Sequence, residues 1–170
     1  MPAEYLKLAQ KRVETHWPPY KNSEDFGYDF RTWVSPYTKG AHSFDGIAVV
    51  LQDWASDDGL TQGLEREVEQ VGRAVNRLTN RRLEKLLLNV LGLRIAETSA
   101  TNVFPFVKPG GMSSGVPQRH MDLTASRFTV HELKMAKPRM ILALGRKTHN
   151  ALRPLPHDSF FGLIRGFSSR

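Results

Sequence analysis

Continuous hydrophobic runs without polar alternation mark the expected strands of this chain. Ile47 to Leu51 and Met140 to Leu144 are such runs, and Thr98 to Phe106 is a further strand candidate that we expect to end at Pro105. Unbroken apolar runs are typical of strands that are covered on both faces, as in a parallel sheet flanked by helices. The pattern therefore predicts a short central sheet with three buried strands.

Hydrophobic residues spaced three or four positions apart predict helices before, between and after these strands. We expect helices over residues 2–14, 64–78, 81–91 (capped by Asn80 and ended by Gly92), 124–136, and from Arg146 onward. This alternation predicts an α/β fold, a three-layer α/β/α sandwich with a short and mostly parallel sheet. We expect a single domain over residues 1–170. Its core is residues 46–170, and residues 1–45 form a helix and an irregular aromatic-rich wrap that partly frames the site.

Composition narrows the classes of function. The chain has 170 residues with 24 basic and 17 acidic side chains, a net charge of +7 that favours a polyanionic partner such as nucleic acid. The absence of cysteine excludes disulfides, zinc–thiolate sites and Cys-ligated iron–sulfur clusters. The histidines show no metal-binding spacing, so we expect no metal or other cofactor. Without a long apolar run or a signal-peptide pattern, we expect a monomeric cytoplasmic protein that binds no membrane.

Three positions carry candidate chemistry. Asp53 follows the first strand directly, and ligands of open α/β sheets bind beyond the carboxyl ends of the strands. The glycine-rich segment Lys108–Pro117 is either a plain connector or a loop that contacts phosphate. Arg146 and Lys147 begin a helix after Gly145, which is either an anion site or a solvated first turn.

Several segments together resemble motifs of the uracil-DNA glycosylase superfamily. Val50–Ser56 is similar to V-x-G-Q-D-P-Y-H, matching it at Gln52 and Asp53, and Thr101–Gly110 is similar to T-N-V-x-x-x-x-P-P-G. Glu132–Gly145 is similar to E-L-x-x-x-x-P-x-x-I-x-x-L-G, and Phe161–Gly166 to F-x-x-L-R-G. The order and approximate spacing of these segments follow the family.

The resemblance implies a monofunctional DNA glycosylase of base-excision repair, which hydrolyses the N-glycosidic bond of uracil in DNA and leaves an abasic site. It gives Asp53 the role of orienting or activating the water that attacks C1′. It makes Asn102 the side chain that reads the edge of the flipped base, because an amide offers both a donor and an acceptor. Base contacts are also expected from Gln52, Trp54 and Phe104. Phosphate contacts are expected from Lys108, Gly110, Gly111, Arg119 and Arg146.

Departures from the family pattern shape the expected substrate. Ala55 replaces a tyrosine that screens out the thymine methyl, which predicts a roomier pocket open to other deaminated bases unless Trp54 fills the space. The H-P-S motif is not in its usual place, although Pro156–Ser159 is similar and makes His157 its candidate histidine. Without this motif and its wedge loop, single-stranded DNA would be preferred, because it needs no unpairing.

Two other functions stay open on the sequence. One is a catalytically weak or inactive DNA-binding relative of the glycosylases. The other is a different α/β domain that binds phosphate or a nucleotide through Gly145–Lys147, although the chain has no G-x-x-x-x-G-K-[ST] or G-x-G-x-x-G pattern.

Overall fold

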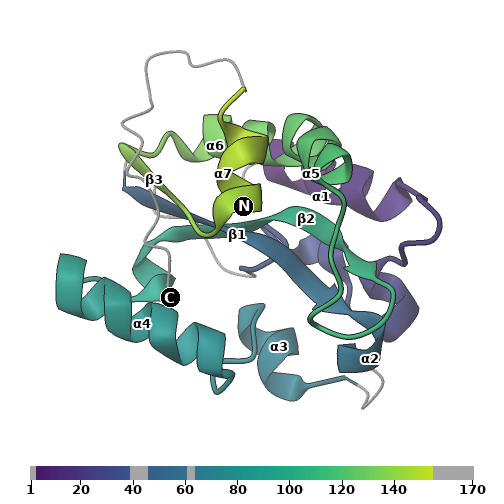
Figure 1. The fold of residues 1–170 in the computed structure, drawn as a ribbon, viewed down its shortest axis with the longest axis horizontal. Coiled ribbons are helices and arrows are strands. Elements are labelled where there is room, and N and C mark those ends of the chain that lie inside the picture. The colour runs from purple at the N-terminus through teal and green to yellow at the C-terminus, as the bar shows by residue number, and fades with distance from the viewer. Residues whose placement is uncertain (1–2, 39–45, 61–63, 155–170) are drawn as a thin grey trace.

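The computed structural model describes residues 3–38, 46–60 and 64–154 (Figure 1). Two of the motif segments, Pro156–Ser159 with its candidate His157 and Phe161–Gly166, lie outside the described residues. No helix within these described ranges has both the length and the apolar character that crossing a membrane requires.

A three-stranded parallel sheet forms the centre of the fold. Its strands are β1 (Ile47–Ser56), β2 (Ser99–Lys108) and β3 (Met140–Ala143), in the order β2-β1-β3. The three expected strands are therefore present, and the pairings of β1 with β2 and with β3 are both parallel. β1 is longer than expected, however, and runs on to Ser56, so Asp53 lies within the strand and not after its end.

Helices cover both faces of this sheet, which confirms the expected α/β sandwich (Figure 1). One face carries α3 (Arg66–Val71) and α4 (Leu78–Leu91). The other carries α1 (Ala3–Glu14), α5 (Gln118–Thr124), α6 (Val130–Ala136) and α7 (Arg146–Leu152). The shorter elements are η1 (Ser23–Phe26), η2 (Phe30–Thr32), α2 (Asp57–Leu60), η3 (Ile95–Glu97) and a π-helical turn η4 (Ala125–Thr129) that joins α5 to α6.

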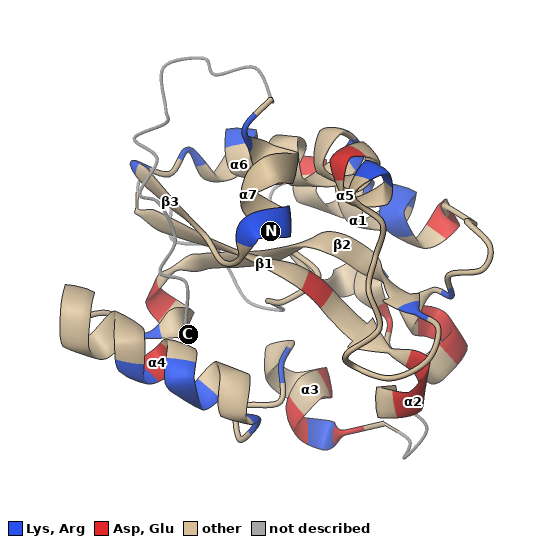
Figure 2. Cartoon of the chain, in the orientation of Figure 1, with Lys and Arg blue, Asp and Glu red and all other residues tan. Residues whose placement is uncertain are grey.

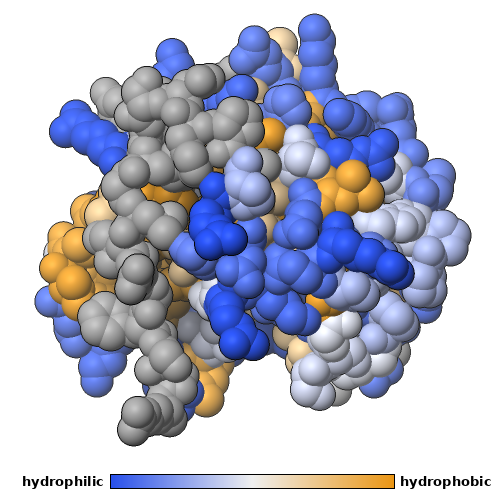
Figure 3. Space-filling model, turned by 45° about the horizontal axis from the view of Figure 1, so that its top comes forward, coloured by the Kyte–Doolittle hydropathy of each residue, from blue (hydrophilic) through white to orange (hydrophobic). Residues whose placement is uncertain are grey.

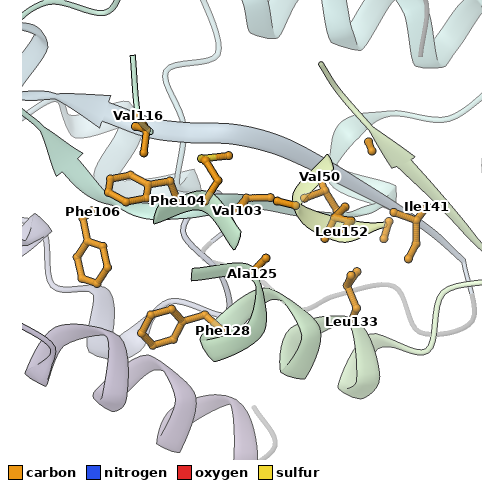
Figure 4. Close-up of a cluster of buried hydrophobic side chains, with 14 of the residues drawn as sticks. Val50, Val103, Phe104, Phe106, Val116, Ala125, Phe128, Leu133, Ile141 and Leu152 are labelled. Carbon is orange, nitrogen blue, oxygen red and sulfur yellow. The ribbon is translucent and has the colours of Figure 1, made fainter. Parts of the chain in front are cut away.

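The two covered faces explain why β1 is hydrophobic at every position of its first half. Ala48 and Val50 belong to the hydrophobic cluster under α5, α6 and α7, which Figure 4 shows in close-up. Val49 and Leu51 point the other way and pack with Leu83 of α4. Successive side chains of a strand face opposite sides, so a strand buried on both sides shows no polar alternation.

Strand β2 continues past Pro105, where the sequence predicted its end. In the register with β1, Asp53 pairs with Phe104 and Ala55 pairs with Val107, so β2 holds one extra residue at this point. Proline is tolerated at an edge strand and at a bulge, because the missing N–H then breaks no ladder hydrogen bond. β2 is an edge strand of the sheet and carries its proline at this irregularity.

The helix expected over residues 64–78 is confined to α3, residues 66–71, and its expected successor begins earlier than predicted. Gly72 ends α3 in the left-handed conformation with φ of +90°, and α4 starts at Leu78. Asn80 is therefore inside α4 and caps nothing at its start; its amide instead donates to the carbonyl of Ala74. Gly92 ends α4 as expected, with φ of +67°.

The helix expected over residues 124–136 is confirmed and extends further toward the N-terminus, to Gln118. The expected core positions Ala125, Phe128, Leu133 and Ala136 are all buried. Their common orientation places α5, the π-helical turn and α6 along one face of the sheet (Figure 4).

Candidate active site

A pocket of about 130 Å³ lies beside the carboxyl half of β1, on the face of the sheet that α3 and α4 cover. Asp53 from β1 and Asn102 from β2 both line it, so the two principal site residues expected from the sequence come together. Its lining residues are Tyr37, Leu51, Asp53, Trp54, Ala55, Gly59, Leu60, Glu65, Val68, Gly72, Arg73, Ala74, Arg77, Thr79, Asn80, Asn102 and Met112. We call this space the Asp53–Asn102 pocket.

Donors engage both carboxylate oxygens of Asp53. The side-chain amide of Gln52 donates to Oδ1 at 2.8 Å. The ammonium of Lys108 lies 2.7 Å from Oδ2. The Asp53 side chain is 8% exposed and that of Lys108 is 3% exposed, so this is a nearly dry ion pair. Two fixed donors restrict the rotation of the carboxylate, and each oxygen still has a lone pair for a further donor such as water.

The amide of Asn102 is buried and half satisfied. Its nitrogen donates to the carbonyl of Pro36 at 3.1 Å, and the residue is 3% exposed. Its Oδ1 has no hydrogen-bond partner among the residues that the structure describes. Buried polar atoms are nearly always paired, so the unpaired acceptor of this pocket-lining residue is one that a ligand N–H could satisfy.

Trp54 and Ala55 both line the pocket. An aromatic cluster supports the Trp54 ring, with ring-centroid distances of 4.7 Å to Phe30 and 5.4 Å to Tyr28. This packing holds the indole in a fixed orientation beside the pocket.

Phe104 does not contact the pocket, contrary to the expected base contact. It is fully buried in the hydrophobic cluster of the opposite face, where its ring packs 4.7 Å from Tyr20 and 6.2 Å from Trp17 (Figure 4). The extra residue in β2 at this point explains the difference, because a bulge changes the face to which the neighbouring side chains point.

Lys108 is also placed differently from the expectation. The sequence put it in an exposed phosphate-contacting loop, whereas it is the last residue of β2 and its ammonium is held by Asp53 and by the carbonyl of Met112 at 2.8 Å. The loop after it contains Gly110, with φ of +79°, whose carbonyl accepts from the backbone of Asp58. Gly111 lies near the Asp58 carboxylate as well, which does not favour a phosphate at these two glycines.

The expected phosphate contacts Arg119 and Arg146 are both exposed, in the first turns of α5 and α7. Lys147, by contrast, donates to the carbonyl of Val116. Figure 2 shows basic residues at the start of α7 and along α4, and acidic residues around α2 and α3. Hydrophilic side chains cover the centre of the face seen in Figure 3.

Several pocket residues were not predicted as site residues. Tyr37, from the aromatic wrap, donates a 2.5 Å hydrogen bond to Oδ1 of Asn80, and the guanidinium of Arg73 lies 5.8 Å from its ring centroid. Burial raises the pKa of Tyr37 to about 12. Arg77 pairs with Glu65 at 2.9 Å at the same pocket. Tyr37 belongs to the wrap that was expected to frame part of the site, and it lines this pocket. Arg73 and Arg77 come from the irregular segment after Gly72, which the sequence did not predict.

Comparisons with known proteins add no relative: no protein-family model matches the chain, and no curated protein matches its sequence. Within the described ranges, no three His, Asp or Glu side chains gather in a group that could hold a metal ion.

Proposed function

We propose that this chain is a DNA glycosylase that hydrolyses the N-glycosidic bond of uracil in DNA and leaves an abasic site. The observation that carries the proposal is that Asp53 and Asn102 line one pocket, together with the buried Oδ1 of Asn102, which has no partner among the described residues. A pyrimidine N–H is the donor that this acceptor lacks, and a carboxylate nearby is suited to orienting water.

The spacing of the two side chains suits a nucleoside. Asn102 pairs in register with Leu51, so Asp53 lies two residues further along the sheet. Two residues of strand correspond to about 7 Å, which leaves room for one ring between the amide and the carboxylate. A base read at its far edge by Asn102 would then place its glycosidic carbon toward Asp53.

The size of the pocket favours a single ring. A cavity of roughly 150 Å³ holds benzene in a protein interior, and the Asp53–Asn102 pocket has about 130 Å³. Although Ala55 adds no bulk where the family has tyrosine, Trp54 lines the same pocket. We therefore favour uracil over the two-ring deaminated purines as substrate.

The proposed reaction is a hydrolysis. A water oxygen held by Asp53 attacks C1′ as the bond from C1′ to N1 breaks and its electron pair moves onto the uracil ring. The Asp53 carboxylate faces the cationic sugar of the transition state and accepts the proton of the water. Asn102 donors and acceptors at the base edge hold the leaving group in place.

A strand-cleavage assay tests this proposal. Single-stranded and duplex oligonucleotides that carry uracil, hypoxanthine or xanthine are incubated with the protein, and alkali then reveals abasic sites. We expect product from uracil, more from single strands than from duplex, and a collapse of activity in Asp53→Asn with DNA binding retained. A wild-type protein that binds the oligonucleotides but yields no product from any of them overturns the proposal.

A DNA-binding relative without activity is the second candidate, because donors already occupy both oxygens of Asp53. The same assay separates the two candidates. Under this alternative, Asp53→Asn leaves the measured behaviour unchanged, since wild type and variant both bind DNA and neither cleaves.

A further inference from the structure

The most unexpected contact of the pocket is the ion pair of Lys108 with Asp53. Lys108 follows the bulge of β2 and pairs in register with Ser56 of β1. Its ammonium lies 2.7 Å from Oδ2 of Asp53, three residues earlier on β1. Its second acceptor is the carbonyl of Met112, a residue that itself lines the pocket. The lysine thus joins the carboxylate to the loop that follows β2.

Because this ion pair is buried, it stabilises the Asp53 carboxylate more than an exposed pair would. A carboxylate removed from water is costly unless it is paired and hydrogen-bonded, and here Lys108 supplies the charge and Gln52 a further hydrogen bond. The pair also neutralises the negative charge of Asp53, which matters where a polyanionic strand has to approach. With its side chain 3% exposed, Lys108 cannot meet a phosphate on the surface.

We propose that Lys108 is a positioning residue for the catalytic carboxylate, acting on the reaction through Asp53 and not through DNA affinity. This inference rests on the proposed glycosylase function. Gln52 donates to one carboxylate oxygen and Lys108 holds the other, so the carboxylate is fixed in one orientation and each oxygen keeps a lone pair for the attacking water. A displaced carboxylate slows the step strongly, because a shift of about 1 Å can cost on the order of 100-fold in rate.

The test is a comparison of single-turnover rates on a uracil-containing single strand. Wild type, Lys108→Met, Lys108→Gln, Asp53→Asn and the double variant Asp53→Asn with Lys108→Met are measured. We expect Lys108→Met to slow the chemical step by about 10- to 100-fold. We expect Lys108→Gln, which keeps an N–H donor, to retain more of the rate. In the Asp53→Asn background, Lys108→Met should have no further effect, because it acts through the missing carboxylate.

Binding measurements separate positioning from phosphate contact. The Kd for the same strand and its dependence on salt should be the same for Lys108→Met and wild type. A lowered salt dependence with an unchanged single-turnover rate would show a phosphate contact and overturn the proposal.

The remaining outcomes are also decisive. If wild type forms product and Lys108→Met matches its rate, the positioning role fails while the glycosylase function stands. If wild type forms no product, the glycosylase function fails and this inference fails with it. Should Lys108→Met not fold, as judged by circular dichroism, Lys108→Gln takes its place, and a wild-type rate in that variant overturns the proposal.

Discussion

The hydroxyl of Thr101 donates a 2.5 Å hydrogen bond to Oε2 of Glu132, which ties the strand that carries Asn102 to the buried side of α6. Glu132 also pairs with Arg12 of α1, and both side chains are 2% exposed. Arg12 in turn donates to the carbonyl of Trp33. One buried charge pair therefore joins two helices, the wrap and the strand beside the pocket.

Glu132→Gln should destabilise the protein strongly. Burial raises the pKa of Glu132, while Arg12 opposes that rise, so the carboxylate and the guanidinium depend on each other. Removing one partner leaves the other charge buried and uncompensated, and we expect a loss of about 3–5 kcal/mol in the free energy of unfolding, measured in urea. The control is Lys21→Met, which breaks the more exposed pair of Lys21 with Asp57 and should cost about 0–1 kcal/mol. Equal losses in the two variants would contradict this account.

Tyr37→Phe should change how stability depends on alkaline pH. Burial raises the pKa of Tyr37 to about 12 from 10.0, so the folded protein holds the phenol proton more tightly than the unfolded chain does. The stability that the protonated Tyr37 phenol contributes to the folded state is fully present below pH 10 and is lost as pH rises toward 12. Relative to wild type, Tyr37→Phe should therefore gain about 2–3 kcal/mol between about pH 9 and pH 12, measured by urea unfolding. A difference between the two proteins that stays constant over this range would show that Tyr37 is not the group concerned.

Lys137→Gly should stabilise the protein. Lys137 ends α6 with φ of +46°, a left-handed conformation that costs a residue with a Cβ more than it costs glycine. We expect a gain of about 0.5–1 kcal/mol in the free energy of unfolding. Lys134→Gly, at an exposed position inside the same helix, is the matched control and should lose about 1 kcal/mol. A loss in both variants would argue against relief of backbone strain.

The sheet and the placement of Asp53 near the carboxyl end of a strand could be predicted because their signals are local. An unbroken apolar run indicates a strand covered on both faces, and the carboxyl ends of parallel strands meet at one edge. The strand argument singled out Asp53, which in fact lies within β1, and the resemblance alone singled out Asn102 in β2; both line the pocket.

The rest of the site depends on local backbone irregularities that a periodic hydrophobic pattern does not predict. With one extra residue in β2, Phe104 packs in the core and the Lys108 ammonium lies beside Asp53. The sequence near Pro105 does not show whether a strand ends there or continues through a bulge. The hydrophobic spacing across Gly72 likewise predicts one continuous helix. Instead, the left-handed conformation of Gly72 ends α3, and Arg73, the next residue, lines the pocket.

Arg119→Ala and Arg146→Ala should each weaken DNA binding without changing the chemical step. Both side chains are exposed at helix starts, as phosphate contacts require. Each lost contact on a single strand should reduce the slope of log K against log salt by about 0.7. Lys7→Ala removes an equal charge from the exposed side of α1 and should leave the slope unchanged. Fluorescence anisotropy over a salt series measures this slope. An equal effect of Lys7→Ala would mean that the arginines act only through the net charge of the protein and not through direct phosphate contacts.

Asn102→Leu should remove base recognition while the fold survives. Leucine has a similar shape and removes the unpaired Oδ1, but it leaves the carbonyl of Pro36 without its donor, so we expect a loss of about 1–3 kcal/mol in the free energy of unfolding with the fold retained. The polar edge of a bound uracil would then face an apolar wall without a partner. We expect excision to fall by about 100-fold or more, with the affinity for undamaged single strands unchanged.

Asn150→Leu is the matched control for this variant, because it makes the same chemical change at an exposed position of α7. It should leave excision at the wild-type level. Wild-type excision in Asn102→Leu itself would mean that the buried amide supports the strand and reads no base. The unpaired Oδ1 would then carry no recognition, and Asp53 alone would remain to support a glycosylase.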